Sequence, residues 1–258
     1  VQAEAIRYAL EANRRRKFRN SGSILWQFNE PFPNVSCTSL IDYYGRPKAA
    51  YYALRKAYST LHISLKHSGL IHLPGSVFTG EVWLHNSLES RPLRYKAEIL
   101  DISSGRKLEA KEGIVHMKAG SSHHAATLRF PIGENAPEWF GVRLTLEGSA
   151  PNVYLFSTRT VEPFSGMLSQ PETELSWSPL GRLSGESRFE VTNTGRHTAL
   201  QVEAYSEGRI VISARQFSIL LPGETAIFEI SSMQPLSNRT GGELKFRAWN
   251  CRKAAVTS

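Results

Sequence analysis

The sequence predicts a mainly β fold, in which a short segment of an α/β barrel precedes two immunoglobulin-like β-sandwiches. Residues 1–58 carry helical spacing on either side of one continuous apolar run, which is the pattern of a helix–strand–helix unit. From residue 59 onward, short strands alternate with turn signals. An aperiodic stretch at 159–172 divides these strands into two sets, and each set of about one hundred residues has the size of one sandwich.

The helix–strand–helix unit begins with an amphipathic helix over residues 1–19. Gly22 then breaks the helical pattern, and the run ILWQF at 24–28 predicts a strand buried on both faces of a parallel sheet. A proline-rich loop follows, and KAAYYALRKAY at 48–58 predicts a second helix, whose first turn tolerates Pro47. The apolar stripe of the first helix consists of Val1, Ala5, Tyr8, Ala9 and Ala12, widened by Ile6 and Leu10.

The strands of the two sets are recognised from alternating or clustered apolar residues. Turn signals such as Pro74-Gly75 and Ser104-Gly105 separate them. In the first set the predicted strands cover 61–67, 77–86, 92–100, 139–148 and 152–158. In the second set they cover 173–178, 187–193, 198–206, 209–217, 224–231 and 243–250. Short strands at this spacing are typical of sandwiches.

Composition and charge narrow the class of protein. The chain has 258 residues, 41% of them apolar, which is enough for packed cores. Its formal charge of +8 is spread along the sequence, apart from the basic run at 14–17, which complements the dipole at a helix end. Because no aromatic–basic platform accompanies the charge, nucleic-acid binding is not predicted. No apolar run is long enough for a membrane-spanning helix, and residues 1–18 lack the pattern of a signal peptide.

Cysteine and histidine usage predicts neither a disulfide framework nor a metal site. Cys37 and Cys251 are the two cysteines and lie far apart in the sequence, so free buried thiols are expected. The pair His123-His124 lacks a third ligand at a useful spacing. Free thiols slightly favour a cytoplasmic over a secreted location, although the compartment is left undetermined. No cofactor is predicted, and the oligomeric state is left open.

The motifs of the first 58 residues resemble the end of the catalytic barrel in glycoside hydrolase family 2. GSILWQFNEPFPN followed by IDYYGRPKAAYYALRKAY is similar to the β-mannosidase and exo-β-glucosaminidase branch of that family. The sequence departs from the usual pattern at Phe32 and Cys37, where the branch commonly has Trp. The matched positions are Trp26, Gln27, Asn29, Glu30, Pro33, Asp42, Tyr43, Tyr44, Gly45, Pro47 and Lys48.

The resemblance implies a domain order and an activity. Residues 1–58 would be the end of a (β/α)8 catalytic barrel, 59–160 a first immunoglobulin-like sandwich and 161–258 a second one. The parent chain would be a retaining exo-glycosidase that hydrolyses β-mannosides or related β-linked sugars. Such enzymes use two carboxyl groups about 5 Å apart. The resemblance places both upstream of this chain, so the chain alone is expected to be inactive. Its expected partners are a carbohydrate substrate and the upstream domains of the same polypeptide.

Three residues are candidate substrate contacts. The resemblance implies that Trp26 lines the subsite of the terminal sugar, where an indole face packs against sugar C–H groups; a core position inside the barrel is the alternative. Asn29 either orients a sugar hydroxyl or satisfies the loop backbone. Glu30 stands where a catalytic acid is found in other strands, but its expected role is to hydrogen-bond within the loop or across the barrel mouth. Asp42 either caps the second helix or contacts ligand.

The alternative function is a non-catalytic carbohydrate-binding or structural β-sandwich module, with residues 1–58 docked on it as a cap. Exposed tryptophans on a sandwich could form a sugar platform, although a core position is more common for such residues. The encoded sequence upstream of Val1 would discriminate the two functions, because a glycosidase requires two strand-end glutamates there. The tryptophans in question are Trp83, Trp139, Trp177 and Trp249.

Overall fold

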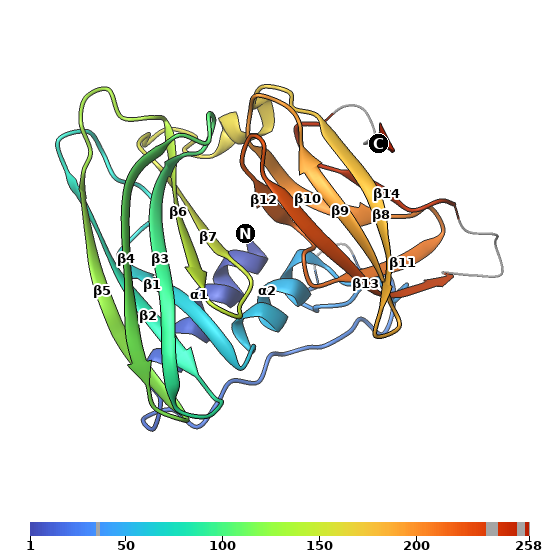
Figure 1. Cartoon of the computed structure of the whole chain (residues 1–258), viewed down its shortest axis with the longest axis horizontal. Coiled ribbons are helices and arrows are strands. Elements are labelled where there is room, and N and C mark those ends of the chain that lie inside the picture. The colour runs from blue at the N-terminus through green and yellow to red at the C-terminus, as the bar shows by residue number, and fades with distance from the viewer. Residues whose placement is uncertain (35–36, 236–241, 252–255, 258) are drawn as a thin grey trace. The chain divides into compact units, whose positions relative to one another are not determined.

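The protein is mainly β (Figure 1). The computed structural model describes residues 1–34, 37–235, 242–251 and 256–257. Helices α1 (Gln2–Arg15) and α2 (Ala49–Ala57) lie in the N-terminal part, and a 3₁₀ helix, η1 (Ser165–Ser169), lies in the predicted linker. The strands confirm the predicted mainly β fold class.

The bounds of the strands agree closely with most of the predicted segments. Strands of the first set are β1 (Leu61–His67), β2 (Val77–Asn86), β3 (Arg91–Asp101), β4 (Lys107–Met117), β5 (Ser121–Pro131), β6 (Trp139–Leu146) and β7 (Asn152–Ser157). Strands of the second set are β8 (Leu175–Leu183), β9 (Glu186–Asn193), β10 (Ala199–Tyr205), β11 (Arg209–Ser213), β12 (Ser218–Leu220), β13 (Thr225–Pro235), β14 (Lys245–Arg247) and β15 (Val256–Thr257).

The chain divides into two compact units. Unit 1 comprises residues 1–7, 24–55 and 170–258, and unit 2 comprises residues 8–23 and 56–169. The division therefore falls within both helices, after Arg7 in α1 and after Arg55 in α2. The boundaries 1–58, 59–160 and 161–258 stay a prediction.

Unit 2 encloses its core between two antiparallel sheets. Their strand orders are β1-β2-β5 and β4-β3-β6-β7. Inward-facing side chains of both sheets form one cluster, centred on the fully buried rings of Phe78, Phe140 and Phe156. The centroid of Phe156 lies 4.9 Å from that of Phe78 and 5.1 Å from that of Phe140. Burial of such large rings is the main stabilising contribution that this unit can obtain.

Unit 1 contains a second β core. Sheets of order β12-β10-β14 and β11-β13-β9-β8-β15 contribute to it. Its largest fully buried side chains are Phe228 and Phe246, whose ring centroids are 5.3 Å apart. Helix α2 packs on this unit through Tyr52, whose ring lies 5.5 Å from that of Phe217 and whose hydroxyl donates to the carbonyl of Val211.

Strand β4 was not predicted, because its sequence lacks the alternation of a half-buried strand. It pairs with β3 at one edge of its sheet, and most of its side chains are exposed on both faces. An edge strand with charged side chains is protected against pairing with another chain. The short strands β12 and β15, and strand β5, were likewise not predicted.

The predicted buried strand at residues 24–28 is wrong for this chain. These residues form no strand, and the side chains of Ile24 and Trp26 are 98% and 85% exposed. Strands of a parallel sheet need partners on both sides to satisfy their backbone groups. The described residues offer none to this segment, which consequently runs as an irregular connection (Figure 1).

The predicted buried face of α1 is also wrong. Within the predicted stripe Leu10 is buried, but Val1 and Tyr8 are exposed, and Glu11, which lies outside the stripe, is buried. The helix buries a polar side chain because partners from distant strands hydrogen-bond to it, as described below. Neither helix, within the residues that the structure describes, is long and apolar enough to cross a membrane.

Candidate substrate-facing loop

The described part of the segment that carries the motif residues, 26–34 and 37–48, is a loop held together by its own backbone. The amides of Leu40 and Ile41 both donate to the carbonyl of Phe28, at 3.0 and 2.9 Å. Asn29 pairs with Ile41 in an isolated parallel bridge, and Ile41 pairs with Pro47 in an antiparallel one. The start of the loop is thereby fixed against the residues that lead into α2.

Glu30 is the buried centre of this loop. Its side chain is only 2% exposed. Ser39 Oγ donates to Glu30 Oε1 at 2.7 Å, and Lys48 Nζ forms an ion pair with the same oxygen. The carboxylate thus faces the loop and not the solvent, which agrees with the expected role of hydrogen bonding within the loop.

Lys48 gathers three parts of the loop around one ammonium group. Besides Glu30, its Nζ donates to Ser39 Oγ at 2.9 Å and to the carbonyl of Cys37 at 3.2 Å. A lysine has three N–H donors, and here each has an acceptor. The backbone amide of Lys48 also donates to the carbonyl of Leu40 at 2.9 Å.

The charge state of Glu30 follows from these contacts. Hydrogen bonds from Lys48 and then from Ser39 hold the pKa of the Glu30 carboxyl below its ordinary value, against the opposing effect of burial. The carboxyl is therefore ionised at neutral pH. A general acid must be protonated before it acts, so this environment argues against an acid role for Glu30.

Trp26 and Asn29 occupy the exposed side of the loop. Trp26 is solvent-exposed along most of its ring, and Asn29 is exposed as well. The peptide bond between Trp26 and Gln27 is cis. The carbonyl of Trp26 accepts a hydrogen bond from Thr38 Oγ1 at 3.3 Å. In this chain Trp26 is thus not a core residue, and its contact with a sugar stays a prediction.

Asp42 closes a turn and does not begin the helix. Its Oδ1 accepts from the amide of Arg46 and its Oδ2 from the guanidinium Nε of the same residue, both at 2.8 Å. Gly45 completes the turn with a positive φ of 81°, a conformation that glycine adopts readily. Helix α2 starts only at Ala49, so the alternative of a cap by Asp42 is wrong.

Both cysteines are free and half-buried, which corrects the expectation of buried thiols. Hydrogen bonds from the backbone of Ser39 and from the Gln27 amide lower the pKa of the Cys37 thiol. The described residues contain no cluster of three or more His, Cys, Asp or Glu side chains that could hold a metal ion.

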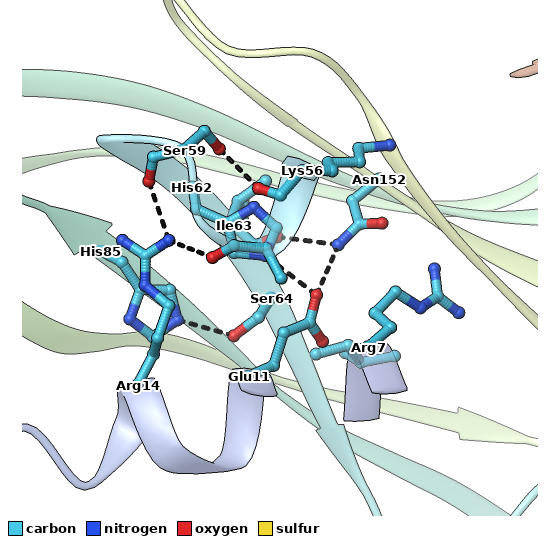
Figure 2. A network of polar contacts seen from close by, with 12 residues as sticks. Arg7, Glu11, Arg14, Lys56, Ser59, His62, Ile63, Ser64, His85 and Asn152 are labelled. Atoms are coloured by element: carbon cyan, nitrogen blue, oxygen red, sulfur yellow. Dashed lines mark hydrogen bonds and ion pairs between the residues drawn. The ribbon is translucent and has the colours of Figure 1, made fainter. Parts of the chain in front are cut away.

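Sequence reasoning missed a buried polar network in unit 2, shown in Figure 2. Glu11 of α1 points at strands β1 and β7. Its Oε1 lies 2.9 Å from His62 Nε2 and accepts from Asn152 Nδ2 at 2.9 Å, and its Oε2 accepts from the hydroxyl of Tyr154 at 2.7 Å. These partners are 51 to 143 positions away in the sequence, so no local pattern indicates them.

The network continues along the outer face of β1 and β2. Ser64 Oγ lies 2.8 Å from His85 Nε2, and His85 Nδ1 lies 2.9 Å from Ser122 Oγ. Ser122 in turn donates to the carbonyl of Arg14, whose guanidinium donates to the carbonyl of Ser59. The second half of α1 is therefore fixed to the sandwich of unit 2 by polar contacts.

A pocket of about 270 Å³ lies at the end of α1 in unit 2. It is lined by Arg14, Lys17, Tyr58 and several serine and asparagine side chains. Of the three candidate substrate contacts, Trp26, Asn29 and Glu30, none lines this pocket.

The four sandwich tryptophans differ in burial. Trp139 is buried and its indole donates to the carbonyl of Pro163 at 2.7 Å. Trp83 and Trp177 are half-buried, and Trp177 packs on the core ring of Phe246. Trp249 is exposed. A platform of several tryptophans is therefore not formed by the described residues.

The fold is that of known glycoside-cleaving proteins. The crystal structure of the exo-chitosanase CsxA of Amycolatopsis orientalis superposes with a TM-score of 0.74 over 97% of this chain, at 19% sequence identity, and this chain covers 33% of it. A β-D-mannosidase from Dictyoglomus thermophilum superposes with a TM-score of 0.70 over 97% of the chain, at 22% identity, with 29% of that protein covered.

Sequence comparison points to the same class. The chain is 28% identical to β-mannosidase B of Aspergillus clavatus over 124 residues, which are 45% of this chain and 14% of that protein. It is 30% identical to β-mannosidase B of Emericella nidulans over 123 residues, again 45% of this chain and 14% of the relative. No protein-family model matches the chain. The matched region spans about a seventh of the length of these curated relatives.

These comparisons confirm the resemblance that the motifs of residues 23–58 predicted. The chain is similar to β-mannosidases and to an exo-β-glucosaminidase-type exo-chitosanase, glycosidases of glycoside hydrolase family 2.

Proposed function

We propose that this chain is the C-terminal portion of a retaining exo-glycosidase that hydrolyses β-mannosides or related β-linked sugars. Its similarity to β-mannosidase B supports this activity. The fraction of the relatives that it covers, 14% of the curated sequences and about a third of the exo-chitosanase, supports a longer parent. The catalytic carboxylates lie outside this chain in this proposal, and the chain by itself does not catalyse hydrolysis.

Residues 1–58 form the last helix, strand and helix of a (β/α)8 barrel in the complete protein. The observation that carries this proposal is the exposure of an apolar segment. Ile24, Phe28 and Phe32 are each more than half exposed within nine residues. Monomeric proteins rarely leave a continuous apolar segment in water, because its burial is favourable by about 25 cal/mol per Å². Neighbouring barrel strands would cover it.

The two β units are immunoglobulin-like sandwiches in this proposal. The strand orders β1-β2-β5 and β4-β3-β6-β7 in unit 2, with antiparallel pairing throughout, support it. The upstream domains of the same polypeptide are the partners of these sandwiches.

Trp26 and Asn29 face the sugar, because active sites of such barrels lie at the C-terminal ends of the strands. Their exposure supports this role. Glu30 belongs to the same substrate-binding loop, but its buried carboxylate supports a role behind the contact surface. It is not a catalytic residue in this proposal.

Covalent labelling of the complete polypeptide tests the proposal. An activated 2-deoxy-2-fluoro β-mannoside should trap a glycosyl–enzyme intermediate, since retaining enzymes pass through one. Peptide mapping should then find the label on a carboxylate outside residues 1–258. A label on Glu30, or the absence of any label together with absent turnover of aryl β-mannoside and β-glucosaminide, would refute it.

A further inference from the structure

The ion pair between Lys48 and Glu30 is connected to both exposed motif residues through the chain and its hydrogen bonds. Glu30 follows Asn29 in the chain. Cys37 and Ser39, the other two acceptors of Lys48 Nζ, flank Thr38, whose hydroxyl donates to the carbonyl of Trp26. One ammonium group therefore fixes the residues next to Asn29 and the residues on either side of the contact to Trp26.

We propose that Lys48 and Glu30 are positioning residues, which hold the loop so that Trp26 and Asn29 are presented to the sugar. This inference rests on the proposed function. Lys48 is suited to it because its backbone leads directly into α2, whereas the three acceptors of its ammonium group lie further back in the loop. Its backbone amide bonds Leu40, so both ends of the residue hold the same turn.

The buried carboxylate of Glu30 and the ammonium group of Lys48 stabilise the loop only together, because a buried charge without its partner is costly. Glu30 is almost completely removed from water, and an ionised carboxylate in that position requires a partner charge. Replacing Lys48 alone leaves the carboxylate without the cation that faces it. Replacing both charged groups by neutral ones removes the charge together with its partner, which is far less costly than breaking the pair.

The experiment compares Lys48→Met, Glu30→Gln and the double variant in the complete enzyme. Lys48→Met should lower kcat/KM on an aryl β-mannoside on the order of 100-fold, the effect of misplacing substrate-contacting groups by about 1 Å. The double variant should recover most of that loss. Arg46→Met is the matched control, because the exposed ion pair of Arg46 with Asp42 lies in the same loop but does not touch Glu30. Its kinetics should remain close to those of the wild type.

A second measurement does not depend on activity. In the 258-residue chain, hydrogen exchange of the Leu40 and Ile41 amides reports the loop directly, because both donate to Phe28. Lys48→Met should accelerate their exchange, and the double variant should restore protection. One outcome is that these amides respond as expected while the wild-type complete protein hydrolyses neither β-mannoside nor β-glucosaminide. In that case the proposed function fails, but the role of Lys48 and Glu30 in holding the loop is supported.

Two results would overturn the positioning role. In the first, Lys48→Met leaves the exchange of Leu40 and Ile41 or the kinetics unchanged. In the second, the double variant is as impaired as Glu30→Gln alone and both are worse than Lys48→Met, which would mean that the carboxylate acts on the substrate itself. If Lys48→Met does not fold, the double variant is compared with Glu30→Gln. Equal impairment of these two variants would mean that the carboxylate acts on the substrate, whereas recovery in the double variant would support the positioning role.

Discussion

The hydroxyl of Tyr154 on strand β7 donates to Glu11 Oε2 of helix α1 at 2.7 Å, so a buried carboxylate joins two segments that are 143 residues apart. Asn152 Nδ2 donates to the other carboxylate oxygen, and His62 Nε2 lies within hydrogen-bond distance of it. The part of α1 that belongs to unit 2 is consequently held there by polar contacts of a residue that the predicted apolar stripe did not include.

Replacement of Glu11 by Ala should destabilise unit 2 strongly. The change leaves buried donors of Asn152 and Tyr154 without this acceptor, and breaking a buried charged network of this kind costs about 3–5 kcal/mol. Chemical denaturation of the chain measures the loss. Glu4→Ala on the same helix is the control, because the Glu4 side chain is 59% exposed and its pair with Arg7 should contribute little. Equal effects of the two substitutions would contradict the account.

The stability of unit 2 should fall as the pH is lowered below about 6.5. Burial lowers the pKa of His62 and His85 from the ordinary value of 6.5, and for His85 the charges of His62, Arg14, Arg15 and Lys17 add to this. The unfolded chain then binds protons that the folded chain does not, so the free energy of unfolding decreases with falling pH. The slope is at most about 1.4 kcal/mol per pH unit for each histidine.

Denaturation between pH 7.5 and 5 tests this dependence. His85→Gln should flatten the pH profile, since a histidine whose pKa is lowered by burial is removed. A profile that is level from pH 7.5 to 5 in the wild type would show that the two buried imidazoles do not govern stability in this range.

Acid should weaken unit 2 through a second group, Glu98 of strand β3. Burial opposes its ionisation, but ion pairs with Lys96, Lys107 and Arg143 outweigh burial and lower the pKa of Glu98 to about 2. The stability that the carboxylate contributes is thus present above pH 4.5 and is lost as the pH falls from 4.5 towards 2. We expect about 2 kcal/mol, less than the full shift would give, because Lys96 and Lys107 are solvent-exposed.

The variant Glu98→Gln isolates this contribution. The difference in unfolding free energy between the wild type and this variant should be largest above pH 4.5 and should shrink below it. A difference that does not change between pH 5 and pH 3 would assign the effect of the substitution to packing and not to charge.

The sequence predicted most strands but not the contacts that place the helices. Strands β1, β2, β3, β6 and β7 were found because their inward side chains alternate or cluster. Strand β4 was missed because an edge strand exposed on both faces carries no such alternation. Helix α1 was predicted over residues 1–19 and is formed over Gln2–Arg15, but its buried face was wrong, since Glu11 is buried against partners on β1 and β7.

The candidate loop shows the same limit. Its motif residues could be named from the sequence, and so could a role for Glu30 within the loop. The pairing of Glu30 with the ammonium group of Lys48 could not be predicted. The two residues are 18 positions apart, and no periodicity of the sequence indicates that they meet. The strand at 24–28 was wrong because strand formation there requires neighbours that the described residues do not supply.

Truncation of Trp26 and truncation of Trp139 to alanine should differ greatly in their effect on the stability of the 258-residue chain. Trp26→Ala should change the stability of the 258-residue chain by less than about 0.5 kcal/mol, since Trp26 is exposed. Trp139→Ala should cost about 3–5 kcal/mol, because it empties a buried site and removes the hydrogen bond to Pro163. In the complete enzyme, Trp26→Ala should instead reduce catalytic efficiency by about 1–3 kcal/mol, the range of ring stacking on aromatic side chains.

Thermal denaturation and kinetics on the same variants separate the two roles. A complete enzyme with Trp26→Ala that is destabilised, yet has near-normal kinetics for its folded fraction, would show that Trp26 is a core residue of the barrel. It would then not be a substrate contact.

Hydrolysis of an aryl β-mannoside, measured for the 258-residue chain beside the complete polypeptide that contains it, tests the central claim most directly. The account predicts turnover by the complete polypeptide and none above background by the chain, because the carboxylate pair lies outside it. Turnover by the chain alone that disappears in Glu30→Gln would contradict this account, and so would a complete polypeptide that cleaves neither β-mannosides nor β-glucosaminides.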